Sequence, residues 1–394
     1  MIAGVLAGLI VAAWLLPFYE LICFTVGLLR EKGSPPSTAG VPPKRLIIQY
    51  TTRGSETMPI LLGNTRRAIK SLRRAYHPTL DVELWVILDA EASTGSPASG
   101  WEADRVFYVP SDFRVASKFK ARALEYSRLQ RLRLGYSDPE TRVILLDDDT
   151  WVDTRYLRQA VRMKESIAQG FTNTNNLRGW WTLFDAIRVH TCKVFCRFYN
   201  RLYPLWVHGE GLTYTADLEQ HVTWGRHATS SAEDLVFGHE AKRLGFRWGY
   251  FDRQIHGSSP LNFRDYVKQR MRWAGGHLVA LRSFLPFWSK IFIIGHYLAG
   301  LIFGVVSLLG ILLWLTGQFA VTPPLSYATT ISLAAWWGLW FYSGYQVHGV
   351  KYGLGVMLLA HVITALHAGI LLYAWIHALL HGVPQTFEVI EKRV

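Results

Sequence analysis

The stretch RVILLDDDTWVD, residues 142–153, ends an apolar run with three consecutive aspartates. The apolar part is typical of a buried strand, and Asp147, Asp148 and Asp149 follow directly at its end. Neighbouring carboxylates repel one another and raise each other's pKa unless a cation lies among them. Hard divalent ions such as Mg²⁺ take one or two carboxylates together with substrate phosphates as ligands. The stretch therefore predicts a metal–phosphate site, although on its own it also fits a solvated Asp-rich turn that caps a helix.

The composition of the chain indicates a membrane protein and excludes a disordered one. Of the 394 residues, 50% are hydrophobic and 14% are aromatic, whereas 18% are charged. Low charge combined with many aromatic residues is the opposite of the disordered signature. The length is sufficient for one catalytic domain plus a second region.

Four long apolar runs predict the membrane segments. The first covers residues 1–29 and carries Glu20 as its one charged residue. Because it is longer than the hydrophobic part of a signal peptide, we expect a retained signal anchor, kinked at Pro17. Three later runs are each long enough to span a bilayer: 291–317, 327–347 and 354–382.

These segments predict the domain organisation. The expected parts are an anchor at 1–29, a Pro-, Gly- and Ser-rich linker at 30–44, a water-exposed domain at 45–285, transmembrane helices at 286–383 and a tail at 384–394. Basic residues flank the first span and precede the second, so we expect the domain in the cytoplasm of a cell-membrane protein. Three spans after the domain would leave the tail on the other side. If the tail instead lies with the domain, one run is re-entrant or interfacial.

Strands and helices alternate along the first part of the water-exposed domain. Strands are expected at 44–54, 81–90, 104–112 and 142–149, and helices at 57–76 and 117–135. This alternation predicts an α/β fold with a mostly parallel sheet, in which ligands bind at the carboxyl ends of the strands. Polar residues lie at these ends: Thr51, Thr52, Arg53, Asp89 and the aspartate run. The chain has no G-x-G-x-x-G or Walker A sequence, so a dinucleotide fold or a P-loop is not expected.

Basic residues precede the aspartate-bearing strand. We assign Lys120 and Arg122 to the phosphates of the ligand, since Lys and Arg commonly bind diphosphates. Attraction of a basic surface to anionic lipid is the alternative.

The segment 178–206 mixes aromatic and basic residues at helical spacing. It predicts an amphipathic helix at the membrane interface, with an ordinary buried helix as the alternative. Cys192 and Cys196 within it lack the ligand number and spacing of a zinc site, so we expect reduced, partly buried thiols.

Two further motifs lie downstream. Glu233 and Asp234 precede an apolar helix in SSAEDLVFG, and Gln269, Arg272 and Trp273 lie in YVKQRMRWAGG just before the membrane runs. Taken singly, an acidic pair at a helix start is often a dipole partner, and the second motif is often a polar helix face.

In this order, Asp89, Asp147-x-Asp149, Glu233-Asp234 and Gln269-x-x-Arg272-Trp273 resemble the motifs of membrane-integrated family 2 glycosyltransferases. Cellulose, chitin and hyaluronan synthases belong to that group. A finer resemblance is to the egghead-type β-1,4-mannosyltransferases. It rests on TTRG (51–54), FKARALEY (119–126), AEDLVFG (232–238), GFRWGYFDRQIHGSSP (245–260) and QRMRW (269–273). Asp148 and Asp149 stand where that family tends to have Glu, which leaves the donor sugar open.

The resemblance implies a GT-A type nucleotide-sugar-binding domain and an inverting mechanism. Asp147 and Asp149 would hold Mn²⁺ or Mg²⁺ on the donor diphosphate. Asp234 would be the general base, with Glu233 as the next candidate. The remaining implied donor-site residues are Thr51, Arg53, Asp89, Lys120, Asp148, Gln269, Arg272 and Trp273.

The expected reaction moves one sugar, mannose or glucose, from a GDP- or UDP-sugar to a lipid-linked or glycolipid acceptor, with a β-glycosidic product. Membrane lipids are expected partners and nucleic acid is not. The alternatives are a processive polysaccharide synthase, for which few spans are present, and a non-catalytic membrane scaffold, against which the complete motif set argues.

Overall fold

The computed structural model describes residues 2–33, 43–76, 78–89, 100–174, 181–225, 232–282 and 286–382. Its centre is an eight-stranded sheet with the order β3-β2-β1-β4-β7-β6-β8-β5. The strands are β1 (Arg45–Thr52), β2 (Asp81–Asp89), β3 (Arg105–Val109), β4 (Thr141–Asp147), β5 (Trp151–Val152), β6 (Ile167–Thr174), β7 (Thr213–Thr215) and β8 (Trp248–Gly257). All four strands expected from the sequence are therefore present.

The sheet is parallel in one half and mixed in the other. β3, β2, β1 and β4 are parallel neighbours, as the alternation of strands and helices predicts. Beyond β4, the short strand β7 pairs antiparallel with both β4 and β6, and β5 pairs antiparallel with β8. The long strands of this second half, β6 and β8, are parallel to one another. The expectation of a mostly parallel sheet is thus confirmed, and the antiparallel exceptions are β7 and β5, which are too short to show a strand pattern in the sequence.

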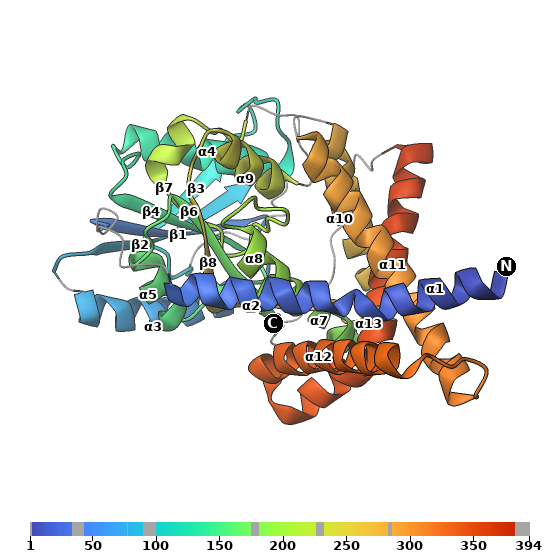
Figure 1. Cartoon of the computed structure of the whole chain (residues 1–394). Coiled ribbons are helices and arrows are strands. Elements are labelled where there is room, and N and C mark those ends of the chain that lie inside the picture. Colours follow the sequence, from blue (N-terminus) through green and yellow to red (C-terminus); the bar gives the residue numbers. More distant parts are fainter. Residues whose placement is uncertain are drawn as a thin grey trace.

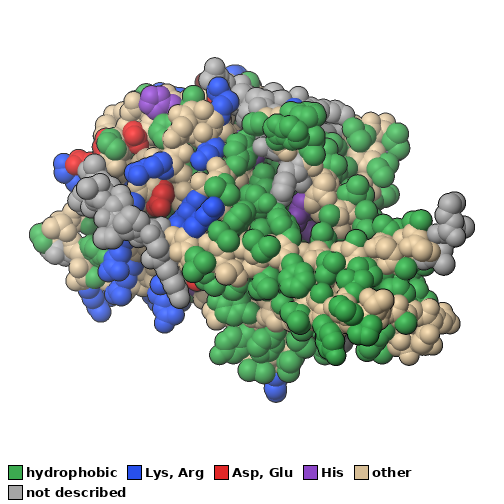
Figure 2. All heavy atoms as spheres, viewed as in Figure 1, with side chains coloured by type: hydrophobic (Ala, Val, Ile, Leu, Met, Phe, Trp, Pro, Cys, Tyr) green, Lys and Arg blue, Asp and Glu red, His purple; other side chains and the backbone are tan. Residues whose placement is uncertain are grey.

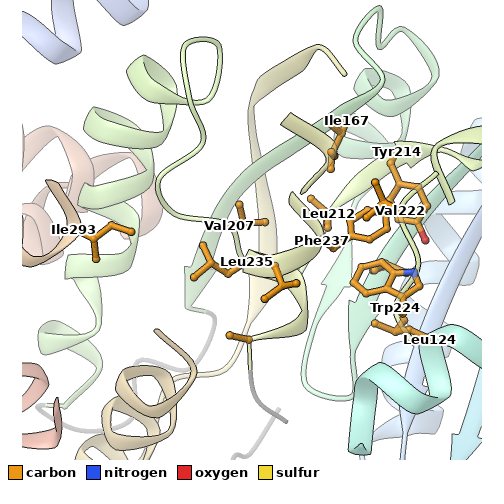
Figure 3. Close-up of a cluster of buried hydrophobic side chains, with 14 of the residues drawn as sticks. Leu124, Ile167, Val207, Leu212, Tyr214, Val222, Trp224, Leu235, Phe237 and Ile293 are labelled. Atoms are coloured by element: carbon orange, nitrogen blue, oxygen red, sulfur yellow. The ribbon is translucent and has the colours of Figure 1, made fainter. Parts of the chain in front are cut away.

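Helices cover both faces of the sheet (Figure 1). On one face, α3 (Met58–Tyr76) and α5 (Thr154–Val161) pack on the apolar side chains of β1, β2 and β4. On the other lie α4 (Phe119–Arg133) and α9 (Glu233–Arg243), with the short helix η3 (Ala216–Gln220) nearby. The core of this second face is rich in aromatic contacts, among them Trp224 stacked on Phe237 with ring centroids 3.8 Å apart (Figure 3).

The membrane helices share a core with the sheet domain. Ile293 of α11 (Phe287–Leu315) belongs to the same buried apolar cluster as Leu235 of α9 and Tyr214 of β7 (Figure 3). The helices after the domain are α10 (Phe263–Arg282), α11 (Phe287–Leu315), α12 (Pro323–His348) and α13 (Val350–His381). Apolar side chains cover the surface of this region, whereas Lys and Arg gather over the sheet domain (Figure 2).

Three helical stretches in the described part of the chain are long and apolar enough to cross a membrane: Gly4–Arg30, Ile293–Leu315 and Val350–His381. The first consists of α1 (Ile2–Leu15) and α2 (Pro17–Gly33), which are separated at Leu16, so the helix is interrupted at the expected Pro17. The expected span at 327–347 is not among them. Its helix, α12, has the necessary length, but Thr, Ser, Tyr and Gln residues lower its hydropathy.

The segment predicted as an interfacial helix is largely buried. Its described part consists of α6 (Trp181–Phe184), α7 (Ala186–Thr191), a π-helical turn η2 (Cys192–Cys196) and α8 (Arg197–Tyr199). It packs between β6 and β8 on one side and α2, α12 and α13 on the other. Two of its basic residues, Lys193 and Arg197, are buried, and both pair with Asp252 at 2.6 Å. The described elements therefore match the alternative, a buried helix, since both cations share a carboxylate inside the protein.

Candidate active site

The carboxyl ends of three neighbouring strands meet at one edge of the sheet. Parallel pairing aligns Thr51 of β1 with Asp147 of β4, and Thr52 with Leu88, which precedes Asp89 at the end of β2. Residues that are far apart in the sequence are therefore brought together by the register of the sheet, as expected for an α/β ligand site.

These strand ends open into a cavity of about 680 Å³. Its walls come from the loop after β1, the aspartate turn, the start of α9, the loop 206–210 and α10. The cavity continues to the membrane helices, where His296, Tyr297 and Gly300 of α11 face Thr364 and His367 of α13. One enclosure therefore joins the acidic edge of the sheet to the membrane region.

The three aspartates have different surroundings. Asp147 is in contact with the ammonium of Lys120, and burial raises the pKa of the Asp147 carboxyl despite this cation. Asp148 accepts a hydrogen bond from Thr52 Oγ1 at 3.0 Å, which fixes it against the end of β1. Asp149 lines the cavity beside them. The tight turn from Asp147 to Thr150 holds all three on the cavity side of the sheet.

Lys120 lies among the acids of the site. Its Nζ contacts Asp147 and lies 3.5 Å from Glu233 Oε1. Burial alone would lower its pKa, but Asp147, Glu233 and Asp234 outweigh burial and hold the pKa of Lys120 above its ordinary value. Glu233 thus has the basic partner that its position beside Asp234 requires.

Asp234 lies in the first turn of α9 and lines the cavity. Burial, together with the neighbouring Glu233, raises the pKa of Asp234 to about 7. The backbone of Gly209 lies close against Lys120 and Asp234: a Cβ at position 209 would be 2.6 Å from Lys120 Nζ and 3.4 Å from Asp234 Oδ2. A carboxyl group that titrates near neutrality in a cavity is suited to take up a proton at physiological pH.

The structure places Arg122 behind the cavity wall and not in it. Its Nη1 donates to Asp89 Oδ1 at 2.8 Å, and its other nitrogens donate to the carbonyls of Phe113 and Pro110. Lys120 and Arg122 are two positions apart on α4, so they point to different sides of the helix. The structure therefore does not bring Arg122 into the cavity with Lys120. Arg122 holds Asp89, which does line the cavity.

The third motif reaches the cavity from α10. Gln269, Arg272 and Trp273 all line it, as do Thr51 and Arg53 from the loop after β1. Arg270, inside the motif, turns the other way. It forms a fully buried ion pair with Asp185 at 2.6 Å, and Asp185 also accepts a hydrogen bond from Ser259 at 2.7 Å.

Several cavity residues were not expected from the sequence. Arg188 of α7 pairs with Glu210 at 2.6 Å, and its guanidinium lies 5.4 Å from the ring centroid of Trp273. His208 and Cys192 line the cavity beside this pair. The signal that could have identified the loop is HGEG (208–211), since two glycines around an acid indicate a tight turn.

The acids at the sheet edge fit a divalent cation that is bound together with a ligand. Among the residues that the structure describes, no group of three or more His, Cys, Asp and Glu side chains forms a metal site. Asp147 and Asp149 would supply two hard oxygen donors, which is the protein share typical of Mg²⁺ sites completed by phosphates and water. The ammonium of Lys120 among these carboxylates indicates that the site favours a positive charge.

Comparison with known proteins gives three findings: a family, curated relatives and a similar solved structure. The model of "Glycosyl transferase family group 2" matches residues 142–381. Beta-1,4-mannosyltransferase bre-3 of Caenorhabditis briggsae is 28% identical over 193 residues, covering 45% of this chain and 42% of that protein. Beta-1,4-mannosyltransferase egh of Drosophila melanogaster is 26% identical over 201 residues, covering 48% and 44%. The chain therefore spans less than half the length of these curated relatives.

The third finding is structural. The mannosyltransferase PcManGT from Pyrobaculum calidifontis, solved in complex with GDP-Man and Mn²⁺, superposes with a TM-score of 0.51 at 15% sequence identity. The match covers 95% of this chain and 99% of that chain. It confirms the predicted fold class, an α/β domain of the GT-A type joined to helices able to span a membrane.

Proposed function

The chain belongs to glycosyl transferase family group 2 and is a glycosyltransferase, and from this premise we propose that it moves mannose from a GDP-sugar to a lipid-anchored acceptor. Support for mannose comes from the bre-3 and egh relatives, which are both β-1,4-mannosyltransferases by name. Support for a GDP donor comes from the GDP-Man bound to the structural neighbour. The proposed product has a β linkage, as an inverting enzyme makes from an α-linked donor.

One observation carries the proposed acceptor class: a single cavity runs from Asp147 and Asp149 to Tyr297 and His367 on the membrane helices. A water-soluble donor would bind at the acidic end of this cavity. An acceptor anchored in the bilayer would approach from the other end, so the two substrates can meet at Asp234 without the lipid leaving the membrane.

We propose that Asp147 and Asp149 hold Mn²⁺ or Mg²⁺. When bound there, the metal would neutralise negative charge on the departing diphosphate. Lys120 would leave its contact with Asp147 and donate to the diphosphate, since an ammonium is a flexible point charge on a long stem. Thr51, Arg53 and Asp89 would bind the nucleoside, and Trp273 would offer its ring face to a sugar.

Asp234 is the proposed general base, removing the proton of the acceptor hydroxyl as that oxygen attacks the sugar. No second carboxylic acid is needed for the leaving group, because the diphosphate departs as an anion held by cations. Closure of the site by Gln269 and Arg272 would exclude water, which otherwise competes with the acceptor.

We also propose that the sheet domain faces the cytoplasm, where nucleotide sugars are found. The basic residues next to the first span support this side. The structure has two candidate spans after the domain, whereas the sequence predicts three. With two crossings, the chain that follows α13 would lie on the same side of the membrane as the domain. Labelling an introduced cysteine in residues 91–99, which lie outside the described residues, would test the orientation: exclusively external labelling contradicts it.

The proposal is tested with full-length protein in detergent or nanodiscs, incubated with Mn²⁺ and either GDP-mannose, UDP-glucose or GDP-glucose. Acceptors are a glucosylated lipid and the matching free glucoside. We expect one mannose per acceptor by mass spectrometry, with the lipid form preferred. Donor hydrolysis without transfer to either acceptor would refute the acceptor class, and products longer than one sugar would favour a processive synthase.

A further inference from the structure

We propose that Cys192 is a reactive thiol within the catalytic cavity and that peroxides and small electrophiles modify it, with Cys196 as its resolving partner. This modification site goes beyond the proposed function. It arises from a group of side chains that sugar transfer does not use, since direct displacement by the acceptor needs no protein nucleophile.

The first element of the site is a thiol–imidazole contact. Cys192 Sγ lies 3.5 Å from His208 Nε2, and His208 Nδ1 lies 3.1 Å from the carbonyl oxygen of Glu210. A carbonyl oxygen can only accept, so Nδ1 carries a proton and donates it. The lone pair of Nε2 in the neutral ring therefore faces the thiol and can take its proton, as in a Cys–His pair activated for attack.

The second element is the charge around the sulfur. A hydrogen bond from Cys196 holds the pKa of the Cys192 thiol well below its usual range. Burial acts to raise this pKa, whereas the positive charges of His208 and Arg188 lower it further. Burial alone would lower the pKa of His208, but Cys192 and Glu210 raise it to about 9. The pKa of Cys196 shifts in the opposite direction. It is raised because the Cys196 thiol donates a hydrogen bond to Cys192 and because Cys196 is buried. A thiolate beside a thiol that can resolve it is the arrangement of redox-sensitive cysteines.

The third element is access. Cys192 and Cys196 are one helical turn apart on η2, and both line the 680 Å³ cavity together with His208 and Trp206. Their exposed fractions are 5% and 1%, so a reagent reaches them through the cavity and not from the outer surface. The third cysteine, Cys23, is equally buried but does not line the cavity, which makes it an internal control.

The chemistry is balanced with hydrogen peroxide as the named oxidant. The Cys192 thiolate attacks one peroxide oxygen, an S–O bond forms, the O–O bond breaks, and the departing hydroxide takes the proton from His208 Nε2 as water. Cys196 then attacks the sulfenic sulfur, an S–S bond forms, and a second water leaves. With a maleimide, the thiolate adds to the double bond and the imidazolium proton goes to the adjacent carbon. Either product alters the wall beside Arg188 and Glu210, so we expect transfer to stop.

The test is modification of the full-length protein in detergent at pH 7, followed by peptide mass spectrometry, which does not depend on any transferase assay. With limiting N-ethylmaleimide we expect Cys192 to react first, at least about tenfold faster than Cys23, since each pKa unit changes the thiolate fraction about tenfold. His208→Gln should slow labelling of Cys192 by a similar factor. With peroxide and dimedone, the wild type should give a Cys192–Cys196 disulfide, and Cys196→Ser a dimedone adduct on Cys192.

Functional consequence is measured as the ratio of treated to untreated transfer within each variant. We expect the ratio to fall more than tenfold in the wild type and to remain near one in Cys192→Ser. Labelling of Cys192 no faster than Cys23, or equally fast in His208→Gln, overturns the proposal. So does inactivation of Cys192→Ser to the same extent as the wild type. A protein that is labelled as expected but transfers no sugar refutes the proposed function and leaves this site standing.

Discussion

Asp234→Asn is the substitution that tests the proposed chemistry most directly. The change keeps the size and shape of the side chain at the start of α9, where its Oδ1 accepts from the Leu235 amide at 2.8 Å. It removes the group that would receive the acceptor proton. The backbone of Gly209 lies against Asp234 and Lys120, and the substitution leaves this contact in place.

The expected loss in transfer rate is about 10²–10⁴-fold, the usual contribution of a positioned general base. Donor affinity should change less than about threefold, because Lys120 and the aspartate run remain. The pKa of about 7 also gives a pH dependence with a definite sign. The base must be ionised, so wild-type kcat/KM rises with pH, by about tenfold between pH 6 and pH 8, as the ionised fraction rises from roughly 0.1 to roughly 0.9. A bound metal near the site would move this rise to lower pH.

The assay follows transfer by mass spectrometry and donor binding by calorimetry in Mn²⁺. Glu240→Gln is a matched control, since Glu240 is a buried carboxylate on the same helix that does not line the cavity. Thermal unfolding checks the fold. The pKa of Asp234 is about 7 in the folded protein and near 4 in the unfolded chain. Its ionisation therefore lowers the free energy of unfolding as the pH rises from 4 to 7, and the Asn variant should be no less stable than the wild type at pH 8. Near wild-type transfer by Asp234→Asn would refute the assignment and leave Glu233 as the next candidate.

Three further substitutions, the first with a matched control, test the surroundings. Asp149→Ala should abolish Mn²⁺-dependent donor binding by calorimetry, whereas Asp153→Ala, which removes the N-cap of α5, should cost about 1 kcal/mol of stability and leave donor affinity unchanged. Lys120→Gln should weaken donor binding roughly 10- to 100-fold, and unaltered affinity would exclude Lys120 from the diphosphate. Asp185→Ala should destabilise the protein by about 3–5 kcal/mol in thermal unfolding, because Arg270 stays buried without its carboxylate. Although burial acts to raise it, Arg270 and Arg188 lower the pKa of Asp185 to about 2, so this stability is present above pH 4 and is lost as the pH falls through 2.

The strands and their polar ends could be predicted from the sequence because each apolar run stops at polar or turn-forming residues, and two of them stop at a charge. RVILLDDD and DVELWVILD both end in aspartate, and the parallel register brings both ends to the same edge. The mixed half of the sheet could not be predicted, since β7 has three residues and its pairing with β4 depends on contacts far apart in the sequence.

Two predictions meet the same physical limit: the sequence does not show which partner a charged residue has. Arg122 is expected at the phosphates, whereas the structure pairs it with Asp89 on the side of the helix away from Lys120. The segment 178–206 is expected at the membrane interface, whereas its Lys193 and Arg197 pair with Asp252, which lies more than 50 positions later. A helix that is buried between a sheet and membrane helices has the same pattern of aromatic and basic residues as one at an interface.

Residues between the motifs connect the parts of the site that the motifs themselves supply. Arg270 anchors α10 on Asp185, and Asp185 also lies 3.4 Å from Arg188, which pairs in turn with Glu210. This chain of alternating charges runs from α10 to the loop beside Asp234. Because Gln269 and Trp273 lie one turn apart on the side of α10 that faces the cavity, the anchor at Arg270 fixes which residues the helix presents there. A buried ion pair adds little net stability compared with apolar packing, so we infer that its role here is to set the rotation of α10.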